Sequence, residues 1–224
     1  MMKVGILASG VQPPVPATEY TIGFSMGGFA VPNANSIQSF PFASPTTNAT
    51  VVGRLNPNGQ FMSGLTAGIG GDVFGVGGGY DIQKFPIAIS SASATNIGDL
   101  TIVRVLAAGN SDISGGTGFA AGGGNSTTSV DSFPFSTPFS TATNIGDLGV
   151  NRGQTAGAAS ATDGHTIGGA DAPANAGTVN DIRSFPFSAP FTSSTVLGDL
   201  SDNTTRQPAG ITDDTTGYRA GGFN

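Results

Sequence analysis

The sequence predicts an all-β protein in which one unit of roughly 50 residues recurs four and a half times. Glycine contributes 36 of the 224 residues and proline 14, so few stretches are long enough for a helix without a helix-breaking residue. Phenylalanine contributes 15 residues and charged residues only 10%, which is more aromatic and less charged material than disordered chains usually carry. Together these observations favour short strands joined by many turns.

The most regular element of the unit runs from a Phe-Pro pair to a Gly-Arg-Leu or Gly-Asp-Leu triplet. The Phe-Pro pairs begin at Phe40, Phe85, Phe133 and Phe185, and the glycines that open the triplets are Gly53, Gly98, Gly146 and Gly198. In every copy the Phe and the Gly are 13 residues apart, which indicates one rigid structural unit. Phenylalanines two apart in a strand face the same side, so we expect a core layer made of Phe40, Phe42, Phe85, Phe133, Phe135, Phe185 and Phe187.

A second element precedes each Phe-Pro pair and consists of an aromatic or His residue, two spacers and Gly-Gly. Its members are Phe24 with Gly28, Phe74 with Gly78, Phe119 with Gly123, His165 with Gly169, and Tyr218 with Gly222. Glycine weakens a strand, so a recurring Gly-Gly predicts a positive φ angle or a close approach of neighbouring backbones. With a weaker apolar element before the aromatic residue, each repeat divides into four short strands, which in the third repeat are about 104–109, 117–123, 130–136 and 143–148.

Four strands in a unit of 45 to 52 residues describe the blade of a β-propeller. We expect a single repeat domain over 1–224, with blades at about 1–56, 57–101, 102–149 and 150–201 and a half blade at 202–224. The aromatic-to-Gly-Gly hairpin occurs five times and the Phe-Pro element four times, so one hairpin is surplus or one blade is incomplete.

Two arrangements of the surplus hairpin are open at this stage. Residues 206–222 could complete the sheet that contains 36–55 and leave the N-terminal hairpin, 3–28, to dock elsewhere. Alternatively the half blade pairs with another subunit by strand addition. Because a bare strand edge promotes aggregation, either arrangement predicts that the surplus hairpin is an assembly contact.

The repeat resembles two known families. The aromatic-x-x-Gly-Gly element followed by a later arginine, at Arg104, Arg152 and Arg206, looks like a degenerate kelch repeat, although kelch blades usually carry a Trp and this chain has none. The more specific resemblance is to GYxxGG…KFPF…ATxxGDLT repeats in structural and tail-fibre proteins of tailed phages, especially those of cyanobacteria and aquatic bacteria. It covers 23–222 and rests mainly on the KFP and ATNIGDLT strings of the second copy. The resemblance implies a kelch-like propeller and a structural role in a virion.

Few residues are candidates for chemistry. The repeated aspartates Asp99, Asp147 and Asp199 could line a channel and bind calcium, but we expect them to cap turns and to pair with nearby arginines, Asp99 with Arg104 and Asp147 with Arg152. The only histidine, His165, occupies the aromatic position of the fourth repeat and is expected to have a packing or surface role, as are Phe139 and Phe191. The sequence therefore predicts no catalytic, cofactor-binding or metal-binding residue, and no enzyme.

Charge and composition limit the partners. The net charge is −6 without a basic stripe, which argues against nucleic acid. The apolar run at 4–8 is too short for an export signal or a membrane span, and no cysteine is present for disulfides. We expect a non-enzymatic virion protein, a tail fibre, spike or capsid-decorating component assembled in the host cytoplasm. Its expected partners are other virion proteins, copies of itself, and a host surface glycan or protein. The alternatives are a bacterial extracellular or cell-surface filament or adhesin and, less favoured, a lectin-like propeller.

Overall fold

The chain is all-β throughout the residues that its structure describes. The computed structural model describes residues 22–27, 35–41, 48–56, 62–67, 72–86, 92–112, 114, 116–124, 127–136, 138–171, 177–201, 208–213 and 216–221. Within these ranges it contains 18 strands and no helix. The fold class predicted from the glycine, proline and phenylalanine content is confirmed at this level.

The strands form five sheets, which we number in chain order. Sheet 1 contains β1 (Ile22–Met26), β2 (Ser36–Pro41), β3 (Thr50–Arg54) and β7 (Ala92–Ser93). Sheet 2 contains β4 (Met62–Thr66), β5 (Val73–Gly77), β6 (Gly79–Phe85) and β8 (Thr95–Arg104). Sheet 3 contains β9 (Ala108–Asp112), β10 (Thr117–Ala121), β11 (Ser129–Pro134) and β12 (Thr143–Asp147). Sheet 4 contains β13 (Ala156–Ala159), β14 (Asp163–Asp171), β15 (Gly177–Pro186) and β16 (Thr195–Asp199), and sheet 5 contains β17 (Ala209–Asp213) and β18 (Thr216–Ala220).

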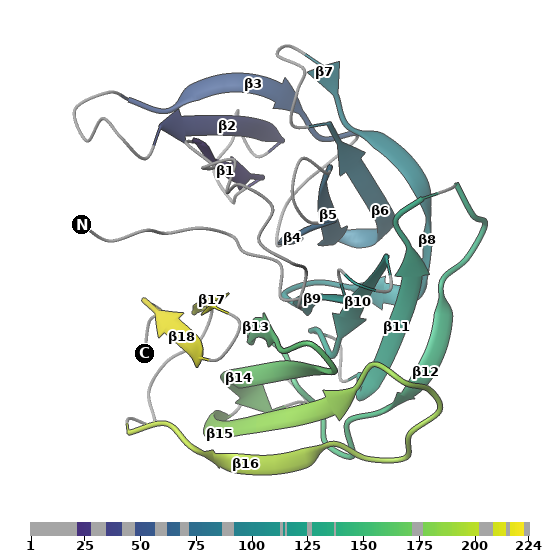
Figure 1. Cartoon of the computed structure of the whole chain (residues 1–224), viewed down its shortest axis with the longest axis vertical. Coiled ribbons are helices and arrows are strands. Elements are labelled where there is room, and N and C mark those ends of the chain that lie inside the picture. The colour runs from purple at the N-terminus through teal and green to yellow at the C-terminus, as the bar shows by residue number, and fades with distance from the viewer. Residues whose placement is uncertain are drawn as a thin grey trace.

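Sheets 2, 3 and 4 are antiparallel meanders whose strands follow one another in chain order. The first strands β4, β9, β13 and β17 contact one another in sequence, so they form the inner edge of the assembly, and the fourth strands lie farthest from it. Figure 1 shows the sheets following one another around the molecule, from β1–β3 through β9–β12 to β13–β16, with β17 and β18 beside β13.

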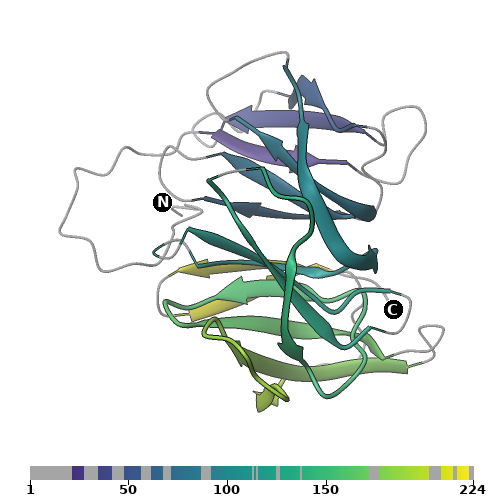
Figure 2. The ribbon, with the colours of Figure 1, turned by 90° about the vertical axis from the view of Figure 1, so that its right-hand side faces the viewer.

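The C-terminal hairpin does not complete the sheet that contains 36–55. Strand β1 lies beside β2, with Gly23 opposite Phe40 and Phe24 opposite Ser39. Strands β17 and β18 form their own sheet next to sheet 4, as the side view in Figure 2 also shows. Because 23–24 and 217–218 carry the same Gly-aromatic pattern, either hairpin could pair with β2, and β1 has the shorter loop to close.

Every four-stranded sheet has a β-bulge at the same place, between the Phe-Pro strand and the strand that carries the triplet glycine. In sheet 3, Val130 lies opposite Gly146 and the next residue, Asp131, lies opposite Asn144, so Ile145 is the extra residue. The same register shift makes the residue before the triplet glycine the extra residue in the other repeats, namely Val52, Ile97 and Leu197. A bulge re-aims the extra side chain, and here it turns that side chain toward the following sheet.

Candidate functional site: the interface between successive sheets

Phenylalanine rings join sheet 1 to sheet 2, sheet 2 to sheet 3, and sheet 3 to sheet 4. Phe119 of β10 stacks on Phe187, with 4.4 Å between ring centroids, and meets the edge of Phe185 at 6.3 Å. One junction earlier, Phe74 lies 4.6 Å from Phe135 and 6.4 Å from Phe133. Offset stacks and edge contacts of this kind add stability beyond the area that they bury. The Phe-Pro strand of one repeat therefore packs against the aromatic residue of the repeat before it.

The predicted core phenylalanines follow this rule. Phe85, Phe133 and Phe185 are at most 1% exposed, Phe135 is also buried, and Phe187 is packed against the core between sheets 3 and 4. Phe40 departs from the expectation of a buried core layer, because it is 37% exposed. Its repeat is the first, and among the described residues no sheet precedes it in the chain to cover that face. Phe42 lies outside the described residues.

After the second, third and fourth Phe-Pro strands a segment contacts the outer strand of the preceding sheet, and we call this segment the clasp. Phe191 bridges to Gly146 in a parallel arrangement, and its backbone N–H donates to the carbonyl of Ile145 at 3.1 Å. A Cβ atom at Gly146 would lie 2.5 Å from the ring of Phe191. Glycine is therefore required at this position, since only a bare backbone lets the ring lie so close.

The same clasp joins the earlier sheets. Phe139 donates its backbone N–H to the carbonyl of Ile97 at 2.8 Å, and its ring lies over Gly98. At the first junction the clasp is β7, which pairs in parallel with β3. The bulge residues Ile97 and Ile145 are each 6% exposed, because the clasp and the next Phe pair cover them.

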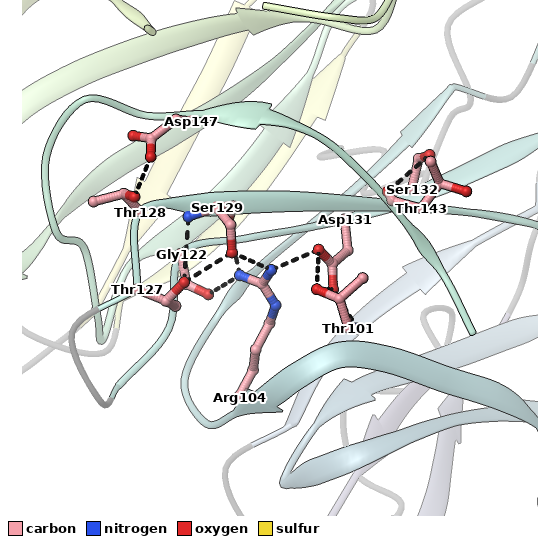
Figure 3. A network of polar contacts seen from close by, with 10 residues as sticks. All are labelled: Thr101, Arg104, Gly122, Thr127, Thr128, Ser129, Asp131, Ser132, Thr143 and Asp147. Carbon is pink, nitrogen blue, oxygen red and sulfur yellow. Dashed lines mark hydrogen bonds and ion pairs between the residues drawn. The ribbon is translucent and has the colours of Figure 1, made fainter. Parts of the chain in front are cut away.

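A buried charge pair crosses the junction between sheets 2 and 3 (Figure 3). Arg104 is fully buried, and its guanidinium donates from Nη1 to the carbonyls of Gly122 and Ser129 at 2.7 and 2.8 Å. Nη2 donates to Ser129 Oγ at 2.7 Å and lies 2.8 Å from Asp131 Oδ1. Thr101 donates to the same carboxylate from its backbone N–H and from its hydroxyl, each at 2.8 Å. The end of β8 is thereby fixed to the second and third strands of sheet 3.

The charges of Arg104 and Asp131 indicate a structural role for this ion pair. Burial lowers the pKa of the Arg104 guanidinium, and the charge of Asp131 and its hydrogen bond oppose that shift. Arginine keeps its proton at any pH that proteins normally meet, so the charge persists and must be matched inside the protein. Asp131 is 0% exposed and matches it.

The arginine partners predicted from the sequence are wrong. Arg104 pairs with Asp131 rather than Asp99, and Arg152 pairs with Asp181 rather than Asp147, at 2.5 Å. Each arginine lies where the chain leaves an outer strand for the next inner strand, so its side chain points at the third strand of the next sheet. Arg206 lies outside the described residues.

The repeated aspartates lie on the outermost strands and therefore do not line the centre of the molecule. Asp147 caps a turn, as its Oδ1 accepts from the backbone N–H of Gly149 at 2.6 Å and its Oδ2 from Thr128 at 2.5 Å. Asp99 is exposed opposite Asp81, and burial, with the Asp99 charge as a smaller cause, raises the pKa of Asp81. Asp199 is exposed on β16. The calcium alternative has no support in this arrangement, and no group of three potential ligands occurs among the described residues.

The Gly-Gly elements have both features that the sequence predicts. The φ angles of Gly78, Gly123 and Gly169 are 72°, 127° and 108°, in the region that favours glycine. The backbone N–H of Gly123 also donates to the carbonyl of Arg152 at 2.5 Å, so the backbones approach closely. Gly28 and Gly222 lie outside the described residues.

His165 is partly buried on β14, at the position that Phe74 and Phe119 hold in the two preceding sheets. Its backbone N–H donates to Asn110 Oδ1 at 3.2 Å. Burial lowers the pKa of its imidazole, and the charge of Asp163 opposes that shift. The surroundings of His165 thus hold it toward the neutral form.

The last four-stranded sheet differs from the others on the face that a following sheet would cover. Its core cluster contains only residues of sheet 4 and the chain directly after it: Ala156, Ala158, Ile167, Ile182 and Leu200. Leu197, the bulge residue, is 59% exposed. Among the described residues no atom lies within 4 Å of a Cβ atom built at Gly198.

Sequence reasoning missed the clasp and the bulge residue beneath it. A signal existed, because Phe139 and Phe191 each stand six residues after the Phe-Pro phenylalanine of their repeats. What the sequence does not display is that the glycine which receives each ring belongs to the previous repeat.

No protein-family model and no curated protein sequence matches the chain. Among the described residues no helix has the length and apolar character needed to cross a bilayer.

Proposed function

We propose that the five sheets are the blades of a kelch-like β-propeller with an incomplete fifth blade. The meander order of sheets 2, 3 and 4, their adjoining first strands and the arrangement around the molecule in Figure 1 support this interpretation. The division of the chain at about 56, 101, 149 and 201 belongs to the same proposal. Sheet 5, with two strands where the others have four, is the incomplete blade.

We further propose that the protein is a non-enzymatic structural component of a virion, a tail fibre, spike or capsid-decorating protein. The observation that carries this proposal is that the polar and aromatic residues recurring in the repeat are engaged in holding sheets together. Arg104 and Arg152 bind carboxylates of the next sheet, and Phe74 and Phe119 pack against its phenylalanines. Such a molecule is suited to a rigid structural role. The resemblance of its repeat to those of phage structural proteins favours a virion as the particle that it helps to build. Its partners in this proposal are other virion proteins, further copies, and a surface glycan or protein of the host.

The second candidate is a subunit of a bacterial extracellular filament or adhesin. The exposed face of sheet 4 favours it as much as it favours the virion, because both assemblies need an open contact surface.

Immunogold electron microscopy separates the two candidates. Antibodies against the chain should label the tail or capsid of particles released from cells that carry its gene. A gene placed among capsid and tail genes would support the same conclusion. Label on the surface of particle-free cells, with secretion genes adjacent, would replace the virion with the filament or adhesin.

A further inference from the structure

Two polar side chains are buried where the inner strands of sheets 3 and 4 meet. Asn110 of β9 is 2% exposed and Thr166 of β14 is 1% exposed. Within the described part of the chain, Asn110 Nδ2 and Thr166 Oγ1 have no hydrogen-bond partner. A buried donor or hydroxyl without a partner costs free energy, so native structures nearly always satisfy such groups with protein atoms or ordered water.

Both side chains project into the same interface. Asn110 reaches sheet 4, because its Oδ1 accepts from the backbone N–H of His165 at 3.2 Å. This bond sets the orientation of the amide and leaves Nδ2 on the other side of the group. Thr166 lies directly opposite Gly157, and directly opposite residues of an antiparallel pair project on the same face. A Cβ atom built at Gly157 would overlap the carbonyl oxygen of Gly109, so this face is the one toward sheet 3.

The carbonyl of Gly109 is a third polar group at this interface. The backbone N–H of Gly109 donates to Ser63 Oγ at 3.0 Å, away from the neighbouring strand β10. In an antiparallel strand the N–H and C=O of one residue point to the same side, so this carbonyl is also directed away from β10. It lies against Gly157 and directly precedes Asn110 in the chain. An amide donor, a hydroxyl and a carbonyl acceptor are thus close together.

At the junction between sheets 2 and 3 the two equivalent positions are apolar. Leu65 of β4 stands where β9 has Asn110. Ala120 of β10 stands where β14 has Thr166. Leu65 and Ala120 belong to the core cluster between those sheets, and Leu65 Cδ2 lies 3.0 Å from a Cβ atom built at Gly109. The place that a leucine fills between sheets 2 and 3 is therefore lined by polar groups between sheets 3 and 4.

We propose that one buried water molecule bridges Asn110 Nδ2, Thr166 Oγ1 and the carbonyl oxygen of Gly109, and so joins sheet 3 to sheet 4. Water fits this set of groups, because it accepts from the amide and donates to the hydroxyl and the carbonyl. Its small size suits a place whose two side chains are almost completely covered. Buried waters typically make about three hydrogen bonds to polar groups of this kind. The inference does not depend on the virion, because it rests on the contacts of sheets 2, 3 and 4.

Substitutions at Thr166 test the water without disturbing the bond between Asn110 and His165. Thr166→Val keeps the shape of the side chain and removes the hydroxyl, and Thr166→Ser is the matched control that keeps it. If the hydroxyl holds the water, T166V should lower Tm by roughly 2–4 °C relative to the unchanged protein, the shift expected for the loss of one hydrogen bond in a chain of this size. A Tm that rises in T166V would overturn the proposal, because it would mean that the hydroxyl is buried without a partner.

Nuclear magnetic resonance of the full ¹⁵N-labelled chain detects the water directly. The side-chain amide protons of Asn110 should show a Overhauser contact to water with the sign of a long-lived neighbour, and T166S should retain it. In T166V the contact should weaken or disappear, because the water loses one of its three partners. Equal contacts in T166V and T166S would refute the bridge. A contact of the Asn110 amide with Thr166 alone, and none with water, would mean that the two side chains bond directly and that the water site does not exist.

Discussion

The junction between sheets 3 and 4 and the open face of sheet 4 present the same local sequence in two environments. Ile145-Gly146 and Leu197-Gly198 both form a bulge followed by glycine, with the same register shift against the third strand. Ile145 is 6% exposed and Leu197 59% exposed. The bulge thus forms without a neighbour to pack against, whereas burial of its side chain depends on the next repeat.

The second strands of sheets 3 and 4 show the same contrast, at the position that Phe119 and His165 occupy. Phe119 in sheet 3 is 2% exposed and packs on two rings of the next repeat. His165 in sheet 4 has Asp163 as its nearby charge and is only partly buried. A hydrophobic residue stands where the next repeat supplies rings, and a titratable residue stands where it does not.

The largest difference between the two environments should come from the buried charge pair. Asp131→Ala leaves Arg104 buried without its counter-ion and should lower the free energy of unfolding by about 3–5 kcal/mol. Asp199→Ala on the exposed strand β16 should change it by less than about 0.5 kcal/mol. Urea denaturation of both variants measures this, and similar losses would mean that burial of the pair is not what stabilises the junction.

The bulge residues should show the next largest difference. Ile145→Ala removes a buried side chain and should cost about 2–5 kcal/mol. Leu197→Ala removes a side chain that is more than half exposed and should cost well under 1 kcal/mol, about 0.5 kcal/mol. The measurement is again chemical denaturation at fixed pH, and a large cost at Leu197 would show that its face is covered in solution.

The clasp glycines test the same comparison by adding an atom. Gly146→Ala places a methyl group against the ring of Phe191 and should destabilise the protein by about 1–3 kcal/mol. Gly198→Ala meets no described neighbour and should be nearly neutral. Thermal unfolding followed by circular dichroism checks both, and the double variant G146A with F191A should recover part of the loss attributable to the clash.

The smallest effect concerns pH. The pKa of His165 is lowered from 6.5 in the folded protein, so the unfolded chain binds more protons near that pH. Stability from this group is therefore fully present above pH 6.5 and declines as the pH falls below it. His165→Phe, which installs the residue of sheets 2 and 3, should remove the decline between about pH 7 and 5.5, where no other side chain of ordinary pKa titrates. An unchanged pH profile of Tm in this variant would assign the dependence elsewhere.

Much of the fold follows from local patterns. The spacing of 13 residues between Phe85 and Gly98, or Phe133 and Gly146, marks the third and fourth strands because a rigid hairpin fixes chain length. The Gly-Gly elements mark the ends of β5 and β10 and a register shift inside β14, because their φ angles favour glycine. Residues within one repeat determine these features, so the sequence of a single repeat is enough to predict them.

The contacts between repeats could not be predicted in the same way. The expected pairing of Asp99 with Arg104 used nearness in sequence, whereas the chain carries Arg104 to the next sheet and to Asp131. Phe40 has the sequence of a core residue but lies in the first repeat, which follows no other sheet in the described chain. Which face is covered depends on the neighbouring repeat, and no pattern inside a repeat carries that information.

The clasp makes the contact between successive repeats asymmetric along the chain. The outer strand of one repeat is covered by the clasp of the repeat that follows it. Each later repeat therefore stabilises the repeat before it. In arrays whose units contact only their neighbours, stability is a sum of unit and interface contributions. Here the two sides of an interface differ, because one contributes a bulge residue and a glycine and the other contributes phenylalanine rings. Removal of the fourth repeat would therefore uncover Ile145 and Gly146 of the third, which Phe191 covers.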